Sequence, residues 1–238
     1  MEILTEGCKK LGVSLTEKQE EQFQNYYRLL LDWNSRVNLT GLTEYSDVMR
    51  KHFLDSLCLI QLSGIDTDNI HKVIDVGTGA GFPGVPLKIV FPDIQLVLLD
   101  SLNKRVRFLD ALKEELGLKN VTAVHGRAEE YGRKKEYREQ FDLCVSRAVA
   151  NLAVLSEYCI PLVRKGGNFV AYKSEKIQEE LRDSQKAIEL LGGKIQEKMD
   201  FTIPETDIAR SLIYIKKIRA TPGRYPRKNG VPGKTPLQ

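Results

Sequence analysis

The sequence predicts an α/β fold in which a doubly wound, mostly parallel sheet follows a helical N-terminal region. From residue 71 onward, short segments rich in β-branched residues alternate with helical segments, as in parallel sheets covered by helices on both faces. The first such strand, over residues 73–76, runs directly into a glycine-rich stretch and then into a helical segment. Before residue 65 the apolar residues follow helical spacing only.

Composition limits the class of protein. The 238 residues are 42% hydrophobic, which is enough for one large domain with an appendage. The net charge of +4 permits an RNA partner without requiring one. The four cysteines form no C-x-x-C pair, which argues against a metal site or a disulfide framework. Residues 1–6 lack the features of a secretory signal, and no apolar run has the length of a membrane span. We therefore expect a cytoplasmic, monomeric protein with no metal and no membrane partner.

Residues 1–65 are expected to be helical. Thr16 and Gln19 have the spacing of a capping box, and aromatic and leucine residues then follow at helical intervals, as expected of a buried helix face. A second helical stretch, over residues 46–62, carries His52 and Asp55 on one face. These two side chains either line the substrate side of a site or form a buried pair that joins two regions of the chain. Residues 63–69 read as a linker.

Seven strands are expected, over residues 72–76, 95–99, 121–124, 141–145, 168–172, 194–202 and 211–218. Helices are expected near residues 84–90, 103–116, 127–138, 151–159 and 175–191. No helical pattern separates the last two strands, which favours an antiparallel hairpin at the sheet edge. We therefore divide the chain into a helical extension (1–65), an α/β domain (66–219) and a tail (220–238). From residue 219 to the end there are five basic residues and no acidic one.

The glycine-rich stretch is the first candidate ligand site. Gly77, Gly79 and Gly81 follow the first strand, and Phe82 stands where a dinucleotide fingerprint has its third glycine. Asp75 precedes the loop; a carboxylate there disfavours a pyrophosphate but is tolerable to a cationic ligand such as S-adenosylmethionine. The alternative interpretation is a tight turn with no ligand.

The other strand ends supply further candidates, because ligands of doubly wound sheets lie across the carboxyl ends of the strands. Asp100 ends the second strand and can accept hydrogen bonds from ribose hydroxyls, or it can cap the next helix. Ala128 and Glu129 follow the third strand and can face an adenine, or simply begin a helix. Arg147 follows the fourth strand, where a ligand contact and a structural salt bridge are both open.

Taken together, these segments resemble the RsmG (GidB) family. Its members are bacterial S-adenosylmethionine-dependent methyltransferases that methylate N7 of a guanine in 16S ribosomal RNA of the small subunit. The matching blocks are residues 30–34 with 38–40, 52–57, 75–84, 100–101 with 104–105, 127–129, 141–142 with 146–148, and 225–228. The resemblance implies a class I methyltransferase fold with a helical N-terminal extension. It also implies that the cofactor is contacted by Gly77, Phe82, Ala128, Glu129 and Arg147.

Methylation at guanine N7 would need no general base and no metal, because N7 has a free lone pair and no proton to lose. We therefore expect no catalytic side chain and assign the rate to positioning. The expected partner is 16S ribosomal RNA or the small ribosomal subunit. Basic residues that suit such a partner are Lys104, Arg105, Arg224, Arg227 and Lys228, with Arg36, Lys173 and Arg210 as further candidates. Each can instead be a solvated surface side chain. If the tail is a phosphate clamp, its removal weakens RNA binding and leaves cofactor affinity unchanged.

Two other functions fit parts of the pattern. A nicotinamide-dependent oxidoreductase shares the strand–loop–helix arrangement, but Phe82 and Asp75 depart from its fingerprint. A nucleic-acid-binding protein with a vestigial cofactor site would share the basic residues.

Overall fold

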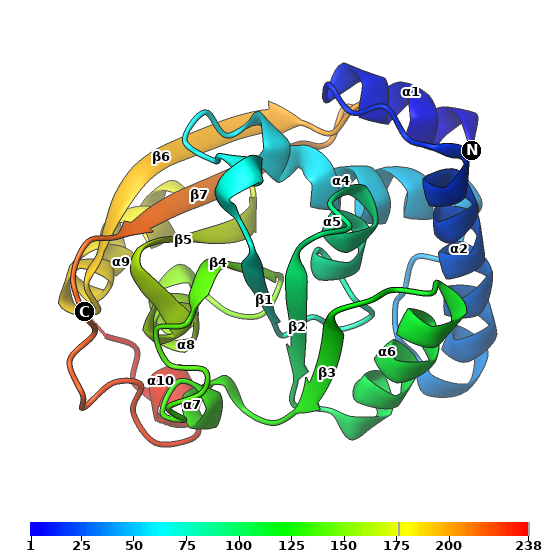
Figure 1. Cartoon of the computed structure of the whole chain (residues 1–238). Helices are drawn as coiled ribbons and strands as arrows, with labels where there is room; N and C mark the ends of the chain where they lie inside the picture. Colours follow the sequence, from blue (N-terminus) through cyan, green and yellow to red (C-terminus); the bar gives the residue numbers. More distant parts are fainter. Residues whose placement is uncertain (176, 238) are drawn as a thin grey trace.

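A computed structural model of the chain describes residues 1–175 and 177–237, and only the backbone of residue 68. One seven-stranded sheet has the order β3-β2-β1-β4-β5-β7-β6 (Figure 1). All seven expected strands are present. Their bounds are Lys72–Val76 (β1), Gln95–Asp100 (β2), Val121–His125 (β3), Phe141–Arg147 (β4), Val163–Ser174 (β5), Gly193–Thr202 (β6) and Ala209–Lys217 (β7).

The last two strands form the expected antiparallel hairpin at one side of the sheet. β7 is antiparallel to both of its neighbours, β5 and β6, and every other pair of neighbouring strands is parallel. The antiparallel strand is thus one position inside the edge, and β6 is outermost. β5 begins five residues earlier than expected, because Gly166 and Gly167 form an irregularity within the strand instead of ending it.

The longer helices also follow the sequence pattern. They are α1 (Glu2–Lys10), α2 (Glu17–Val37), α5 (Gly84–Val90), α6 (Asn103–Glu115), α8 (Leu152–Cys159) and α9 (Gln178–Leu190). The capping box of Thr16 and Gln19 is confirmed at the start of α2. Residues 176 and 238, which belong to the expected helix over 175–191 and to the expected tail, lie outside the described residues.

The prediction of a helix over residues 127–138 is wrong. Only one turn forms, α7 (Ala128–Tyr131), and turns follow it. Gly132 lies against Pro226 of the tail, where an added Cβ would come within 2.9 Å of the proline ring. Arg138 then donates hydrogen bonds to the carbonyls of Thr221 and Tyr225. Tertiary contacts with the tail therefore determine this segment, and such contacts are invisible to local periodicity.

The second N-terminal helical stretch is irregular. It consists of α3 (Tyr45–Asp47), the π-helical segment η1 (Val48–Leu54), α4 (Asp55–Leu57) and the 3-10 turn η2 (Cys58–Gln61). Short 3-10 turns also form at η3 (Thr67–Asn69) and η4 (Ile160–Leu162), and the tail contains the short helix α10 (Val231–Lys234). π-Helical segments are rare and often occur at functional sites. Here the carbonyls of Lys51 and His52 accept hydrogen bonds from Arg147.

Two hydrophobic cores lie on opposite faces of the sheet. Alternation along β1 places Val73 in the first core and Ile74 in the second. The first core contains residues of α1, α2, η1, α5 and α6, so the N-terminal helices share a core with the sheet. The second contains residues of α8, α9 and the tail, including Tyr225. Both cores end at the carboxyl edge of the strands, where the glycine loop lies.

Phe53 of η1 joins the N-terminal helices to the glycine loop. It is fully buried, and its ring lies 5.0 Å from that of Phe23, 5.1 Å from that of Tyr26 and 5.9 Å from that of Phe82. We predict that Phe53→Ala lowers the free energy of unfolding by about 3–5 kcal/mol, measured by urea denaturation. The matched control, Ile218→Ala, removes a half-exposed side chain and should change it by less than about 0.5 kcal/mol. Equal stability of the two variants would contradict this packing.

Candidate functional site

The glycine loop after β1 leaves open space at the sheet edge. Gly77 and Gly79 have φ angles of +69° and +61°, which residues with a Cβ rarely adopt. A Cβ on Gly77 would lie 2.4 Å from a methyl group of Val149, so a larger residue there would also displace that side chain. A Cβ on Gly79 would meet no atom within 4 Å. The space beside Gly79 is therefore free of side chains, and the backbone of Gly77 and Gly79 is partly exposed there.

Asp75 supports this loop from behind. Its Oδ2 accepts hydrogen bonds from the Thr78 hydroxyl at 2.7 Å and from the Gly84 amide at 2.8 Å, and the side chain is fully buried. Burial raises the pKa of Asp75 to about 7, against the lowering effect of the two hydrogen bonds. The sequence suggested only that a cationic ligand could tolerate this carboxylate; in the fold the group faces the protein interior, where it shapes the loop.

Asp100 ties the loop to the second strand. Its Oδ2 accepts from the Gly79 amide at 2.9 Å and pairs with Arg105 at 3.3 Å, while Oδ1 accepts from the Leu102 amide at 2.9 Å. Helix α6 begins after Leu102 without a side-chain cap. The alternative in which Asp100 caps that helix is therefore wrong. A carboxylate offers about four acceptor positions, so Oδ1 retains capacity for a hydroxyl donor.

Two cavities meet at the glycine loop. The larger, about 630 Å³, lies beside η1 and the ends of β4, β5 and β7, and we call it the N-terminal cavity. The smaller, about 380 Å³, is lined by residues 99–101, 126–129 and 149–151 together with Tyr158 and Gly233, and we call it the tail cavity. Gly77 lines both, and the loop after β4 contributes Ala148 to the first and Val149 to the second. A ligand that crosses the loop would thus reach from one cavity into the other.

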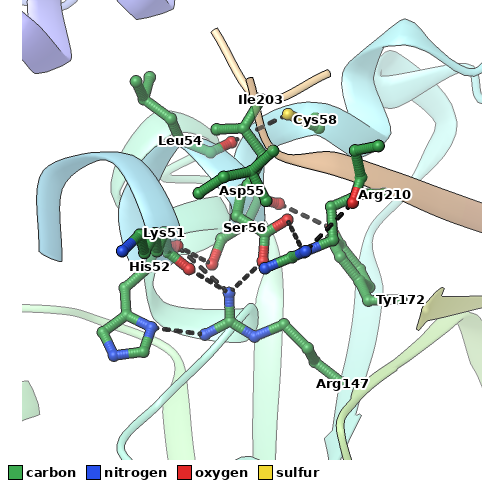
Figure 2. A network of polar contacts seen from close by, with 12 residues as sticks. Lys51, His52, Leu54, Asp55, Ser56, Cys58, Arg147, Tyr172, Ile203 and Arg210 are labelled. Atoms are coloured by element: carbon green, nitrogen blue, oxygen red, sulfur yellow. Dashed lines mark hydrogen bonds and ion pairs between the residues drawn. The ribbon is translucent and has the colours of Figure 1, made fainter. Parts of the chain in front are cut away.

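Arg147 is the centre of a polar network in the N-terminal cavity (Figure 2). Its Nη1 donates to Asp55 Oδ2 at 2.7 Å and to the carbonyl of Lys51 at 3.3 Å. The structural salt bridge left open by the sequence is therefore present. Burial raises the pKa of Asp55, and Arg147 partly opposes this effect. Arg210 lies on the other side of Asp55, with Nε 3.8 Å from Oδ1.

Strand alternation brings this network together. Arg147 lies two residues beyond Val145, on the face of β4 that packs toward the N-terminal helices. It is in register with Tyr172 of β5, which belongs to the same core and whose hydroxyl donates to the carbonyl of Ser56 at 2.6 Å. The neighbouring strands β4 and β5 thus turn Arg147 and Tyr172 toward η1 and α4.

His52 is neutral and has a defined tautomer. Its Nδ1 lies 3.2 Å from Arg147 Nη2, which can only donate, so Nδ1 accepts and Nε2 carries the hydrogen. Nε2 then donates to the Thr40 hydroxyl at 2.9 Å. The imidazole stacks on Phe82 with ring centroids 4.5 Å apart. Burial, assisted by the charge of Arg147, lowers the pKa of His52 from 6.5 to about 3.

The residues expected to contact a cofactor meet at this edge of the sheet. Gly77, Gly79, Phe82 and Arg147 line the N-terminal cavity. Gly77 also lines the tail cavity, with Asp100, Ala128 and Glu129. Phe82 is buried between the rings of Tyr26 and His52.

The basic candidates are more scattered. Arg105, Lys173 and Arg210 line the N-terminal cavity. Exposed Lys104 donates to the carbonyl of Val37, and exposed Arg36 pairs with Asp32.

In the tail, Arg227 is bound to Glu157 of α8, which is fully buried. Arg224 is exposed with its guanidinium 5.0 Å from the Tyr225 ring, and Lys228 is also exposed.

Sequence reasoning missed several residues of the two cavities. They include Thr40, Lys51, Tyr172 and Glu180 in the first and Tyr158 and Gly233 in the second. Tyr172 ends a strand and could have been found by the rule that located Arg147. No local signal distinguishes the others, because they belong to helices, turns and the tail that reach the site only through folding.

This fold and site define a class I S-adenosylmethionine-dependent methyltransferase. The sheet order with an antiparallel β7, the glycine loop after β1 and the acidic end of β2 are the features of that class. Solved structures agree in fold. A S-adenosylmethionine-dependent O-methyltransferase from Thermotoga maritima has a TM-score of 0.52 at 15% identity, covering 80% of this chain and 71% of its own. A branched-chain polyamine synthase variant from Thermus thermophilus has a TM-score of 0.58 at 15% identity, covering 83% and 64%.

The chain belongs to the GidB family, described as rRNA small subunit methyltransferase G, whose sequence model matches residues 19–208. A ribosomal RNA small subunit methyltransferase G from Lachnoclostridium phytofermentans is 54% identical over 98% of this chain and 95% of its own length. That from Alkaliphilus metalliredigens is 51% identical over 99% and 98%. The resemblance noted in the sequence is confirmed, and the chain is an enzyme of the methyltransferase class.

Within the described residues, no group of three or more His, Cys, Asp or Glu side chains is arranged to hold a metal ion. Nor does any helix in that part of the chain combine the length and the apolar character needed to cross a membrane.

The lowered pKa of His52 leads to a prediction about how the stability of the protein depends on pH. Between pH 6.5 and about 3 the unfolded chain binds a proton that folded His52 does not, so His52 reduces stability as pH falls through this range. We expect nitrogen NMR to detect a neutral ring protonated at Nε2 from about pH 8 down to about pH 5. His52→Gln should lose less stability than the wild type on acidification. An imidazolium signal from His52 at pH 6 would contradict the assignment.

The raised pKa of Asp75 leads us to predict that the stability of the protein depends on pH in the opposite direction. Its folded pKa of about 7 exceeds the ordinary 3.8, so its contribution to stability is complete below 3.8 and is lost as pH rises to 7. Asp75→Asn retains an oxygen for Thr78 and Gly84, and its amide nitrogen replaces Oδ1, which has no hydrogen-bond partner among the described residues. Unfolding in urea should show the wild type losing stability relative to the variant from pH 4 to 7. Parallel curves would show that Asp75 ionises normally.

Proposed function

We propose that this chain transfers a methyl group from S-adenosylmethionine to N7 of a guanine in 16S ribosomal RNA. We choose N7 because the acid–base groups in the N-terminal cavity are already hydrogen-bonded within the protein. Guanine N1 and the exocyclic amine hold protons that must leave on methylation, whereas N7 holds none. An enzyme for N7 therefore needs no general base at the target atom.

The groups that could serve as bases in this cavity are already engaged. Asp55 accepts from Arg147, and Glu180 accepts from Lys173 and from the amide of Leu152. The accepting nitrogen of His52 faces Arg147. Among the described residues these are the cavity's only carboxylates and imidazole, and each has a cationic or amide donor on at least one of its acceptor atoms.

We infer an orientation for the cofactor from the residues that line the two cavities. We place its adenosine in the tail cavity, with Ala128 and Glu129 at the base and Asp100 Oδ1 at a ribose hydroxyl. The methionine part crosses the bare backbone of Gly77 and Gly79, where a side chain on Gly79 would fill the open space. When bound, this cofactor supplies an electrophilic methyl group on a sulfonium that departs as a neutral thioether. Such a leaving group needs no Lewis acid.

The N-terminal cavity then receives the target base. Its rim carries Lys51, Arg105, Lys173 and Arg210 beside Arg147. Guanidinium and ammonium groups suit the O6 acceptor of guanine and the adjoining phosphates. Phe82 is held between Tyr26 and His52 and provides a rigid wall. The rate comes from holding the base and the cofactor at attack distance.

The names of similar proteins support ribosomal RNA as the substrate. Proteins that are about half identical over almost the whole chain carry the name ribosomal RNA small subunit methyltransferase G. We infer that 16S ribosomal RNA, bare or within an assembling small subunit, is also the substrate of this chain.

The identity of the methylated atom can be measured directly. Ribosomal RNA from cells that lack or express this chain should differ at one guanine, which becomes cleavable by borohydride and aniline as 7-methylguanine does. An added methyl group at N1, N2 or a ribose would contradict the proposal.

In single-turnover assays of Asp75→Asn, which has no titrating group behind the loop, the rate should be independent of pH from about 6 to 9. A slope that follows one ionisation would indicate a general base.

A further inference from the structure

The C-terminal tail is held firmly on the body of the protein. The Arg227 guanidinium forms a two-point contact with Glu157, with Nε 2.9 Å from Oε1 and Nη2 2.6 Å from Oε2, and the Arg227 amide also donates to Oε1. Tyr225 is buried in the second core, and Arg138 donates to two tail carbonyls. Figure 1 shows the tail beside α7 and α8. Arg227 therefore serves as an anchor and is not a free phosphate ligand.

Beyond this anchor the tail reaches the tail cavity. The amide of Gly230 donates to Glu129 Oε1 at 2.9 Å, and the neighbouring Asn229 side chain donates to Glu130. Gly233 lines the cavity, where an added Cβ would lie 3.8 Å from the Tyr158 hydroxyl. A segment 101 residues from Glu129 in sequence thus completes a cavity that residues of α7 and α8 also line.

We propose that residues 230–233 form a wall of the adenosine pocket and that Gly230 fixes the carboxylate of Glu129 for the cofactor. This inference rests on the proposed placement of adenosine in the tail cavity. Glu129 is buried, and among the described residues no donor contacts its Oε2. A buried carboxylate held at one oxygen and open at the other suits an amino or hydroxyl donor of a nucleoside. The tail is then a cofactor-retaining segment.

This assignment changes what removal of the tail should do. A phosphate clamp would leave cofactor affinity intact, as its basic composition alone suggests. A pocket wall predicts instead that the cofactor escapes more readily while most tail cations remain in place. The two roles can be separated because the anchor at Arg227 precedes the wall in sequence.

The first test is a chain that ends at residue 229, which retains Tyr225 and Arg227. Isothermal titration with S-adenosylmethionine should give a Kd about tenfold higher than that of the full chain. Adenosine should weaken by a similar factor, because the wall contacts the adenosine half. The melting temperature without ligand should fall only slightly, since both anchors remain although the packing of Leu237 against the second core is lost.

A second pair of variants keeps the proposal testable if the shortened chain is unstable. Gly233→Leu places a side chain at the cavity wall and should weaken adenosine binding. Lys234→Leu introduces the same side chain one residue further along the tail and should leave adenosine binding unchanged. Wild-type Kd values for adenosine in both the shortened chain and Gly233→Leu would overturn the proposal, and a change confined to the salt dependence of RNA binding would identify a phosphate clamp. Because these titrations do not involve the methylated base, they are independent of the assignment of guanine N7.

Discussion

The buried ion pair between Arg147 and Asp55 is the interaction on which the arrangement of the site depends. Asp55 belongs to the N-terminal helices and Arg147 to the end of β4, so the pair joins the two parts of the chain across the N-terminal cavity. Removing one partner of such a pair leaves a buried charge uncompensated and typically costs about 3–5 kcal/mol. The π-helical segment η1 adds backbone carbonyls to the guanidinium. The N-terminal extension is therefore a wall of the N-terminal cavity as well as a hydrophobic cover for the sheet.

The positive charge of Arg147 also determines the chemistry that its neighbours can perform. It occupies one oxygen of Asp55 and the accepting nitrogen of His52, and it helps keep that imidazole neutral. The carboxylates and the imidazole of this cavity thus each have a cationic or amide donor on at least one acceptor atom. Methyl transfer to an atom with a free lone pair is the reaction that makes least demand on such groups. The buried pair thus connects the fold to the proposed choice of target atom.

The tail shows that a basic residue can also have a structural cause. Five positive residues and no negative one suggest an RNA contact, yet Arg227 is bound to a fully buried glutamate and its neighbours carry the chain to Glu129. A basic side chain in a loop can be present because an internal carboxylate requires a partner. Gly230 of the tail also has a structural role. Gly230 has a φ of +77°, which allows the chain to turn and present its amide to the cavity.

The sequence by itself determined the seven strands, the glycine loop and the acid at the end of β2, because strand periodicity and the φ requirements of glycine are local properties. It also identified Ala128, Glu129 and Arg147, since residues that follow parallel strands must gather at one edge. Only the tertiary structure decided that Asp75 faces inward, that His52 lies on Phe82, and that the helix after β3 ends within one turn. Burial and partners across the fold settle those features. Contacts between segments distant in sequence leave no periodic trace in either one, which is why the tail's approach to Glu129 could be read only from the folded chain.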